Sequence, residues 1–314
     1  FRSADDAFLR WGNNINLMQR IAPLILVAIG QTFILISGGI DLSVGSIIGL
    51  SNVVAATLPY SDVPLNYGLW LVVPLLVASG AGMINGLLVA KAKFPPIIAT
   101  LATSAVFQGA ALFILSQPGG SVSIEAVNVT TGFLFGAIPI PLIIFLLALA
   151  IAHIIVTRTQ FGRSMYAIGG NPDIAFESGI AVQRVTIRVY TLGGFFAGLA
   201  GLFLSARMFS GDPLVGQPYV LDSIAVSVIG GTSLFLGRGG VIGILGGAYV
   251  FRLLGNILNL LGVAAFYQYV VRGLVLIVAL LVTSSDASTI IGRWFRENVF
   301  KRRRHAVPQG ESRD

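Results

Sequence analysis

The sequence predicts an all-α protein that crosses a membrane many times. Of its 314 residues, 55% are hydrophobic and only 11% are charged, and the mean hydropathy is +0.86. Soluble domains carry about 25% charged residues, so the composition excludes a soluble fold. The 38 glycines follow no collagen-like period, and they fit a bundle of closely packed membrane helices.

Apolar runs long enough to cross a hydrocarbon core of about 30 Å predict about nine spans. Three of these runs are short, and we expect them to be broken, tilted or incomplete crossings. Several spans carry pairs of glycines four residues apart, such as Gly82 with Gly86 and Gly194 with Gly198, which predict close helix packing. We place the spans at residues 19–37, 43–58, 68–90, 97–116, 139–157, 186–208, 219–232, 240–259 and 264–284.

The distribution of lysine and arginine predicts the orientation of the chain. Most of the 20 basic residues lie in the connections on one side or after residue 292, and cytoplasmic loops carry this excess. We therefore expect a cytoplasmic C-terminus and an external residue 1. The predicted parts are an external segment (1–20), a membrane domain (21–284) with a long cytoplasmic connection (158–185), and a basic cytoplasmic tail (285–314). The tail fits contact with lipid headgroups rather than with nucleic acid.

A Gly- and Ser-rich break at residues 37–46 separates the first two predicted spans. Polar backbone at membrane depth is tolerated only where protein or a water-filled path surrounds it. Asp41 and Ser43 have two interpretations here. They form a helix cap and a shaping turn, or they contact the solute at a gate in a translocation path.

The cytoplasmic connection predicts a short helix of about two turns. Asn171 suits the N-cap, Pro172 the first helical position, and Asp173 the first turn, whereas Gly179 suits the end. The side chains that this helix offers to a partner are Ile174, Phe176, Glu177 and Ile180.

Polar side chains inside the predicted spans are candidates for function, because ions in a membrane are costly unless they are paired. We expect Asp222 to pair with Arg272 or Arg252, as a structural ion pair or as part of a sugar path. Uncharged amides line a path or form interhelical hydrogen bonds, and the sequence leaves both roles open. These amides are Asn52, Asn85, Gln108, Asn256 and Asn259.

The sequence offers no machinery for catalysis. It has no cysteine, no Walker A loop, no cluster of metal ligands and no Ser/His/Asp set. We expect no bound cofactor, no metal and no enzymatic activity. If ATP drives transport, a partner protein hydrolyses it.

Five motifs resemble those of the permeases of bacterial ribose/xylose/arabinose/galactose-type ABC importers. The likeness runs in order from about Ile15 to Val282. The motifs are Gly39–Ser46, Tyr166–Asn171 with Ser178–Ile180, Leu221–Ala225, Ile229–Leu234 and Leu258–Val263.

This resemblance implies a ten-span ABC importer permease of the bacterial inner membrane, with the first span missing from the sequence. The charge-based orientation predicts the same missing span. It also implies two permease copies, cytoplasmic ABC ATPase subunits that bind ATP and Mg²⁺, and a periplasmic sugar-binding protein. The connection at 158–185 would hold the coupling helix that docks on the ATPase. The coupling candidates are Gly169, Gly170, Asn171, Asp173, Glu177, Ser178, Gly179 and Ile180.

The translocation path or gate candidates are the polar groups already named: Asp41, Ser43, Asn52, Asn85, Gln108, Asp222, Asn256 and Asn259. A secondary transporter or channel for a small polar solute is the alternative, because broken helices and intramembrane charges occur there too. An intramembrane enzyme lacks a recognisable nucleophile and base.

Overall fold

A computed structural model describes residues 11–58, 65–136, 138–234 and 237–283 of the chain. The predicted tail at 285–314 and the first part of the predicted external segment lie outside these residues. The described chain forms twelve helices and one two-stranded hairpin. The elements are α2 (Trp11–Ile36), α3 (Val44–Thr57), α4 (Leu65–Ala90), α5 (Pro96–Ile114), α6 (Ile124–Thr131), β1 (Phe133–Leu134), β2 (Ile138–Pro139), α7 (Ile140–Arg158), α8 (Gln160–Gly170), α9 (Pro172–Glu177), α10 (Val182–Met208), α11 (Tyr219–Ile229), α12 (Gly243–Leu260) and α13 (Ala265–Thr283).

Each predicted span coincides with one helix, although some ends differ. The helix α11 ends at Ile229 rather than at 232, because Gly231 adopts a φ of +89°, which a right-handed helix does not allow. By length and hydropathy, α4, α5, α7, α10 and α12 can each span a membrane, whereas the apolar parts of α2, α3, α11 and α13 within the described residues are shorter. The total number of crossings therefore stays a prediction.

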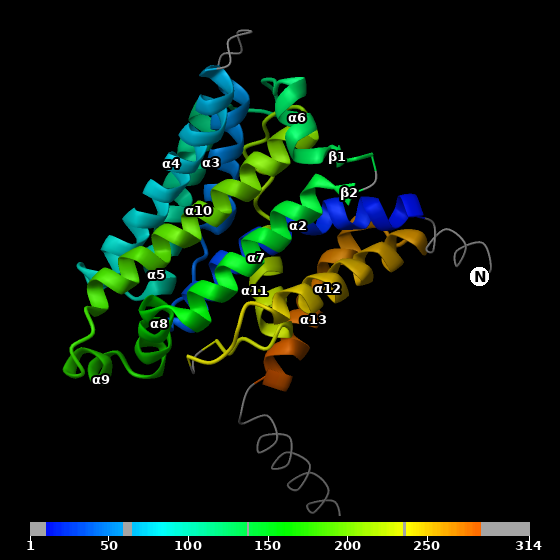
Figure 1. Cartoon of the computed structure of the whole chain (residues 1–314). Coiled ribbons are helices and arrows are strands. Elements are labelled where there is room, and N and C mark those ends of the chain that lie inside the picture. The colour runs from blue at the N-terminus through cyan, green and yellow to red at the C-terminus, as the bar shows by residue number, and fades with distance from the viewer. Residues whose placement is uncertain (1–10, 59–64, 137, 235–236, 284–314) are drawn as a thin grey trace, which may run out of the picture.

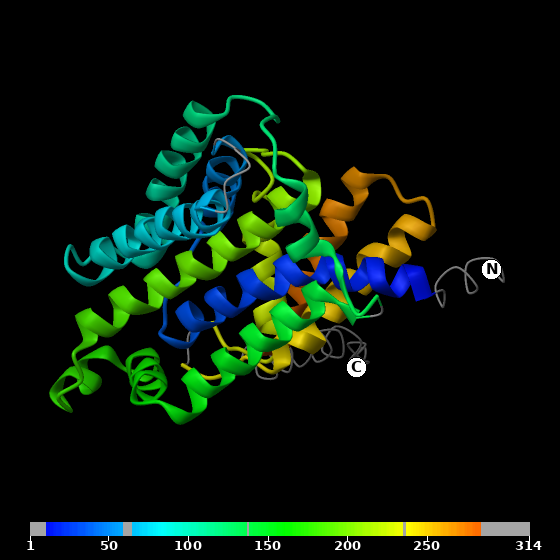
Figure 2. The ribbon, with the colours of Figure 1, turned by 45° about the horizontal axis from the view of Figure 1, so that its top comes forward.

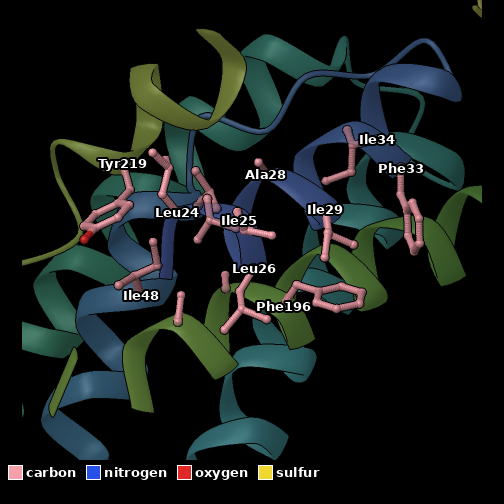
Figure 3. Close-up of a cluster of buried hydrophobic side chains, with 14 of the residues drawn as sticks. Leu24, Ile25, Leu26, Ala28, Ile29, Phe33, Ile34, Ile48, Phe196 and Tyr219 are labelled. Atoms are coloured by element: carbon pink, nitrogen blue, oxygen red, sulfur yellow. The ribbon is translucent and has the colours of Figure 1, made fainter. Parts of the chain in front are cut away.

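The centre of the molecule is α2, which runs between α10 and α7 (Figure 2). Residues 21–36 of α2 are nearly all buried, so this helix is apolar around its whole circumference. Figure 3 shows its side chains between those of α3, α10 and α11. The rings of Phe33 and Phe196 meet edge to face, with 5.8 Å between their centroids.

The outer helices expose apolar side chains instead. Leu101 and Val106 of α5 are 60% and 66% exposed, and Leu147 and Ile154 of α7 are similarly open. A soluble monomer rarely exposes apolar surface of this extent, whereas a membrane protein presents it to lipid. The burial pattern therefore agrees with an integral membrane protein whose core is α2 and α10.

The predicted glycine pairs bring helix backbones together. A Cβ on Gly82 of α4 would overlap the carbonyl oxygen of Tyr190, and a Cβ on Gly194 of α10 would overlap that of Ala78. The pair Gly45 and Gly49 of α3 packs differently: Gly49 lies against Pro213 of the loop before α11, and Gly45 lies against Gly216 of that loop and Val220 of α11. Small residues thus set the spacing between the central helices, as they do in membrane bundles generally.

The two ends of the bundle carry different short elements (Figure 1). One end holds α6 and the hairpin, in which Phe133 pairs with Pro139 in antiparallel register. The opposite end holds α8 and α9, together with the turn between α2 and α3. Long helices connect these ends, so a movement at one end reaches the other through few elements.

Gly82→Ala is expected to destabilise the protein, because the added methyl group has no room between α4 and α10. Overpacking of this kind costs about 1–3 kcal/mol. Gly80→Ala is the matched control, since no atom lies within 4 Å of its added Cβ. Thermal unfolding of both variants in the same detergent measures the difference. Equal melting temperatures would contradict the importance of this contact.

Candidate functional site

The polar break lies inside the protein, between the end of α2 and the start of α3. Gly38 adopts a φ of +80°, which turns the chain after Ile36. Gly39 packs against Tyr190 of α10 so closely that a Cβ would lie 2.5 Å from the phenol oxygen. Tyr190 itself is 1% exposed. Protein therefore encloses Gly39, Asp41 and Ser43, whereas Gly38 is exposed and lines a cavity, which agrees with a polar interruption surrounded by protein and an open path.

Asp41 and Ser43 are joined to α4 and α5 by a buried chain of hydrogen bonds. The backbone N–H and the hydroxyl of Ser43 donate to Asp41 Oδ1 at 2.7 and 2.6 Å. Asn85 Nδ2 of α4 donates to Ser43 Oγ at 2.7 Å, and Thr103 Oγ1 of α5 donates to Asn85 Oδ1 at 2.6 Å. All four side chains are buried. This geometry favours the cap and turn interpretation of Asp41 over a solute contact, and it does so through the turn: Asp41 accepts from the N–H of Ser43, the residue before α3, whereas no described side chain caps the first N–H groups of the helix.

Two further path candidates bind backbone of α10 and of the loop between α10 and α11. Asn52 Nδ2 donates to Gly201 O at 3.1 Å, and Asn52 Oδ1 accepts from the N–H of Asp212 at 2.7 Å. Gln108 Nε2 donates to Pro213 O at 2.9 Å. These amides use their hydrogen-bonding groups within the fold, so they act first as supports for this loop.

The charged candidates meet between α11, α12 and α13. Arg272 Nη1 lies 3.6 Å from Asp222 Oδ2, so Arg272 is the nearer of the two arginines that the sequence offers as partners. Arg252 instead lies over the ring of Tyr219, with 5.6 Å between Cζ and the ring centroid. Asp222 is 3% exposed and lies in the first turn of α11, where the helix dipole favours a negative charge.

A cavity of about 210 Å³ opens beside this ion pair. Its lining includes Asp222, Arg272 and Gln217, together with the ring of Tyr269. Asn259 is not part of this lining, because its Oδ1 accepts from Gln268 Nε2 at 2.9 Å where α12 turns into α13. In this cavity, two charged side chains of opposite sign adjoin free volume inside the bundle.

The predicted short helix is present as α9. Asn171 Oδ1 accepts from the N–H groups of Asp173 and Ile174 at 2.9 and 3.1 Å, which is the expected N-cap. Gly179 follows the helix with a φ of +82°. Ile174 and Phe176 are 61% and 72% exposed. Of the other coupling candidates, Gly170, Asp173, Glu177 and Ser178 are exposed, and Ile180 is half-buried against the core.

A second cavity, of about 430 Å³, separates α9 from the break between α2 and α3. Gly38, Gly39 and Tyr190 line one wall, and Gly169 and Pro172 line the other. The wall formed by α8 is held by Tyr166, whose hydroxyl donates to Gly239 O at 2.7 Å. Burial raises the pKa of this phenol, so it stays protonated and keeps its proton for that bond.

The structure therefore gathers the candidates into three places rather than one. These are the break with Asn85, the cavity at Asp222, and the surface of α9. Sequence reasoning missed α8, Tyr190 and Thr103. Among these, Thr103 had a signal, since Thr100 and Thr103 lie on one face of an otherwise apolar span. Tyr190 had none, because its role depends on contact with Gly39 in another helix.

Asp41→Ala is expected to lower the free energy of unfolding by about 1–3 kcal/mol, the typical cost of leaving a buried donor, here the N–H of Ser43, without its acceptor. Asp41→Asn keeps an oxygen at the same place and is expected to retain most of this stability. Thermal unfolding in detergent measures both variants. If Asp41→Asn destabilises as much as Asp41→Ala, the negative charge matters and the cap interpretation is wrong.

Comparison with known proteins gives a family for the whole described bundle. The family model described as "Branched-chain amino acid transport system / permease component" matches residues 13–280. The chain is 43% identical over 282 residues to the Ribose import permease protein RbsC of Bacillus subtilis (strain 168), covering 88% of this chain and 85% of that one.

Two Escherichia coli (strain K12) proteins are also similar. The D-allose transport system permease protein AlsC is 36% identical over 276 residues, covering 87% of this chain and 83% of that one. The Xylose transport system permease protein XylH is 33% identical over 346 residues, covering 90% and 87%. No solved structure is significantly similar to the chain. The match from residue 13 to residue 280, together with these relatives, shows that the chain belongs to this family of transport permeases.

Proposed function

We propose that this chain is the membrane-spanning permease subunit of an ATP-binding cassette importer. It forms the translocation path for a monosaccharide, which a periplasmic binding protein delivers, and ATP hydrolysis on partner subunits drives the transport. The observation that carries this proposal is α9, a capped surface helix that exposes two large apolar side chains beside the helix break. Phe176 and Ile174 lie together on this short helix, and an exposed aromatic side chain beside an aliphatic one suits the core of a protein interface.

The charge distribution supports a cytoplasmic position for α8 and α9. Basic side chains at this end of the bundle are exposed, and such an excess marks cytoplasmic loops. An ATPase that hydrolyses cytoplasmic ATP would meet the permease at this face. The exposed basic residues are Lys91, Lys93, Arg158, Arg163, Arg184, Arg188 and Arg238.

Direct backbone contacts link this end to the central helix. A Cβ on Gly169, at the end of α8, would overlap the carbonyl oxygen of Ile36, the last residue of α2. A Cβ on Gly38 would lie 3.5 Å from Gly169 Cα. A push on α9 would therefore move α8 against the end of α2 and the break that follows it. A movement of α9 driven by ATP hydrolysis would therefore reach the central helix α2 through the contacts of Gly169.

The names of the relatives guide the choice of solute. The similar permeases import ribose, allose or xylose, so we infer a pentose or hexose as the solute of this chain. D-ribose is the first probe, because the 43% identical relative is a ribose permease. The proposal further includes a second permease copy, identical or not, and a bacterial inner membrane. It includes no nucleic acid, and it assigns ATP and Mg²⁺ to the partner ATPase.

Reconstitution tests the function directly. The chain is expressed with the ATPase and binding protein encoded beside it, and the complex is placed in liposomes. Uptake of labelled D-ribose, or of another pentose or hexose that the binding protein carries, is expected only with ATP and with both partners. Uptake that persists without any ATPase subunit would show a secondary transporter or channel instead.

Phe176→Ala is expected to weaken binding of the ATPase subunit about tenfold or more, because a large exposed aromatic side chain is a typical interface hot spot. Stimulation of ATP hydrolysis by the loaded binding protein should fall with it. Phe113→Ala is the matched control, since Phe113 is 92% exposed at the opposite end of the bundle. Equal effects of the two changes would argue against α9 as the docking element.

A further inference from the structure

The cavity beside Asp222 contains polar groups whose hydrogen bonds are unmet. The 3.6 Å between Arg272 Nη1 and Asp222 Oδ2 exceeds the usual range of a hydrogen bond, and Oδ2 accepts none from the described residues. On α12, Arg252 Nε and Asn256 Nδ2 also lack a described partner; these two residues lie one turn apart and next to the cavity lining rather than in it. Buried polar groups are normally satisfied, so this layer has capacity to bind a polar solute.

A purely structural ion pair would have a different geometry. An arginine that holds a buried carboxylate for stability commonly does so with hydrogen bonds of about 2.7–2.9 Å. Here Arg272 keeps 30% of its side chain exposed, whereas Asp222 keeps 4%. The pair is therefore separated and accessible from one side, at the edge of a cavity. Polar groups inside a membrane protein commonly face a solute path.

The size and charge of the cavity define the ligand class. A volume of about 210 Å³ is below the roughly 300–1,000 Å³ of drug-sized pockets, so it suits one small solute. The lining carries one charge of each sign, on Asp222 and Arg272, and Arg252 outside the lining also attracts the Asp222 carboxylate, so the cavity does not favour a cation. A carboxylate accepts from hydroxyls and a guanidinium donates to oxygen. The ring of Tyr269 has Arg272 Cζ over one face, at 5.6 Å from the centroid, and its other face remains for a sugar.

We propose that this cavity, between Asp222, Arg272 and Tyr269, is the subsite where the permease itself contacts a neutral monosaccharide. The Asp222 carboxylate accepts a hydrogen bond from one sugar hydroxyl, and the Arg272 guanidinium donates to an oxygen of the sugar. The Tyr269 ring packs against the apolar face of the sugar. This inference rests on the proposed function, and it gives the permease a share in choosing the solute.

The test compares uptake with ATP hydrolysis in the complete importer in liposomes, with D-ribose as the probe. Tyr269→Leu removes the ring, and Arg272→Lys keeps the charge but loses the planar fork. For each, we expect uptake to fall about tenfold, the effect of losing a contact worth about 1.4 kcal/mol. ATP hydrolysis stimulated by the loaded binding protein is expected to stay within about twofold of the parent. Tyr267→Leu is the control, because Tyr267 is 58% exposed on the same helix but does not line the cavity.

A charge exchange separates a sugar contact from a structural pair. Asp222→Arg combined with Arg272→Asp retains an attraction between α11 and α13 but reverses donor and acceptor. We expect this double variant to assemble and to remain deficient in uptake. Restored uptake would overturn the proposal, as would a parallel fall of uptake, ATP hydrolysis and melting temperature in Tyr269→Leu and Arg272→Lys.

The two proposals fail in distinguishable ways. If the parent importer shows no ATP-dependent uptake of any monosaccharide, the proposed function fails. If the parent transports D-ribose and both Tyr269→Leu and Arg272→Lys transport it equally well, the subsite alone fails.

Discussion

The close approach of backbones at glycine holds the central helices in place. In lipid, burying an apolar face against another helix yields little of the hydrophobic gain that folds a soluble protein, because lipid tails are equally apolar. Association then depends on van der Waals contact and on hydrogen bonds between helices. Gly82 and Gly194 provide that contact between α4 and α10, and Gly30 provides it between α2 and α10. The position of α10 in turn fixes Tyr190 against the helix break.

Hydrogen bonds between helices add to the stabilisation that close packing at the glycines provides. Where the chain leaves helical geometry, between α2 and α3, its polar groups are taken up by side chains of α4 and α5. The chain from Asp41 through Ser43 and Asn85 to Thr103 therefore ties two helices, α4 and α5, to the segment between α2 and α3. The amides of Asn52 and Gln108 serve the loop before α11 in the same way. By contrast, polar atoms of Asp222, Arg252 and Asn256 have no hydrogen-bond partner among the described residues. This difference distinguishes polar residues that support the fold from those that we propose to contact a solute.

Local chemistry determined which features the sequence could predict. Hydropathy located the nine helices of the predicted spans, and capping chemistry at Asn171, Pro172 and Gly179 predicted α9. The sequence does not predict the amphipathic helix α8, because Gly162, Gly169 and Gly170 interrupt its helical pattern of apolar residues. The choice between Arg252 and Arg272 as partner of Asp222 stayed open, since it depends on how α12 and α13 are rotated. The backbone partners of Asn52 and Gln108 left no pattern in the sequence.

The contact between Gly169 and Ile36 has a mechanical consequence. Main-chain atoms meet there with no flexible side chain between them, so the contact between α8 and α2 is rigid. A displacement of α8 by a few tenths of an ångström would be transmitted to α2 without being absorbed by rotamer changes. Substitutions at Gly169 cannot change the distance between α8 and α2 in small steps, because even the methyl group of alanine would push the two backbones apart. If α9 docks the ATPase as proposed, the fold itself determines how its movement reaches α2, and differences between solutes would then rest on side chains elsewhere, such as those of α11 and α13 beside the Asp222 cavity.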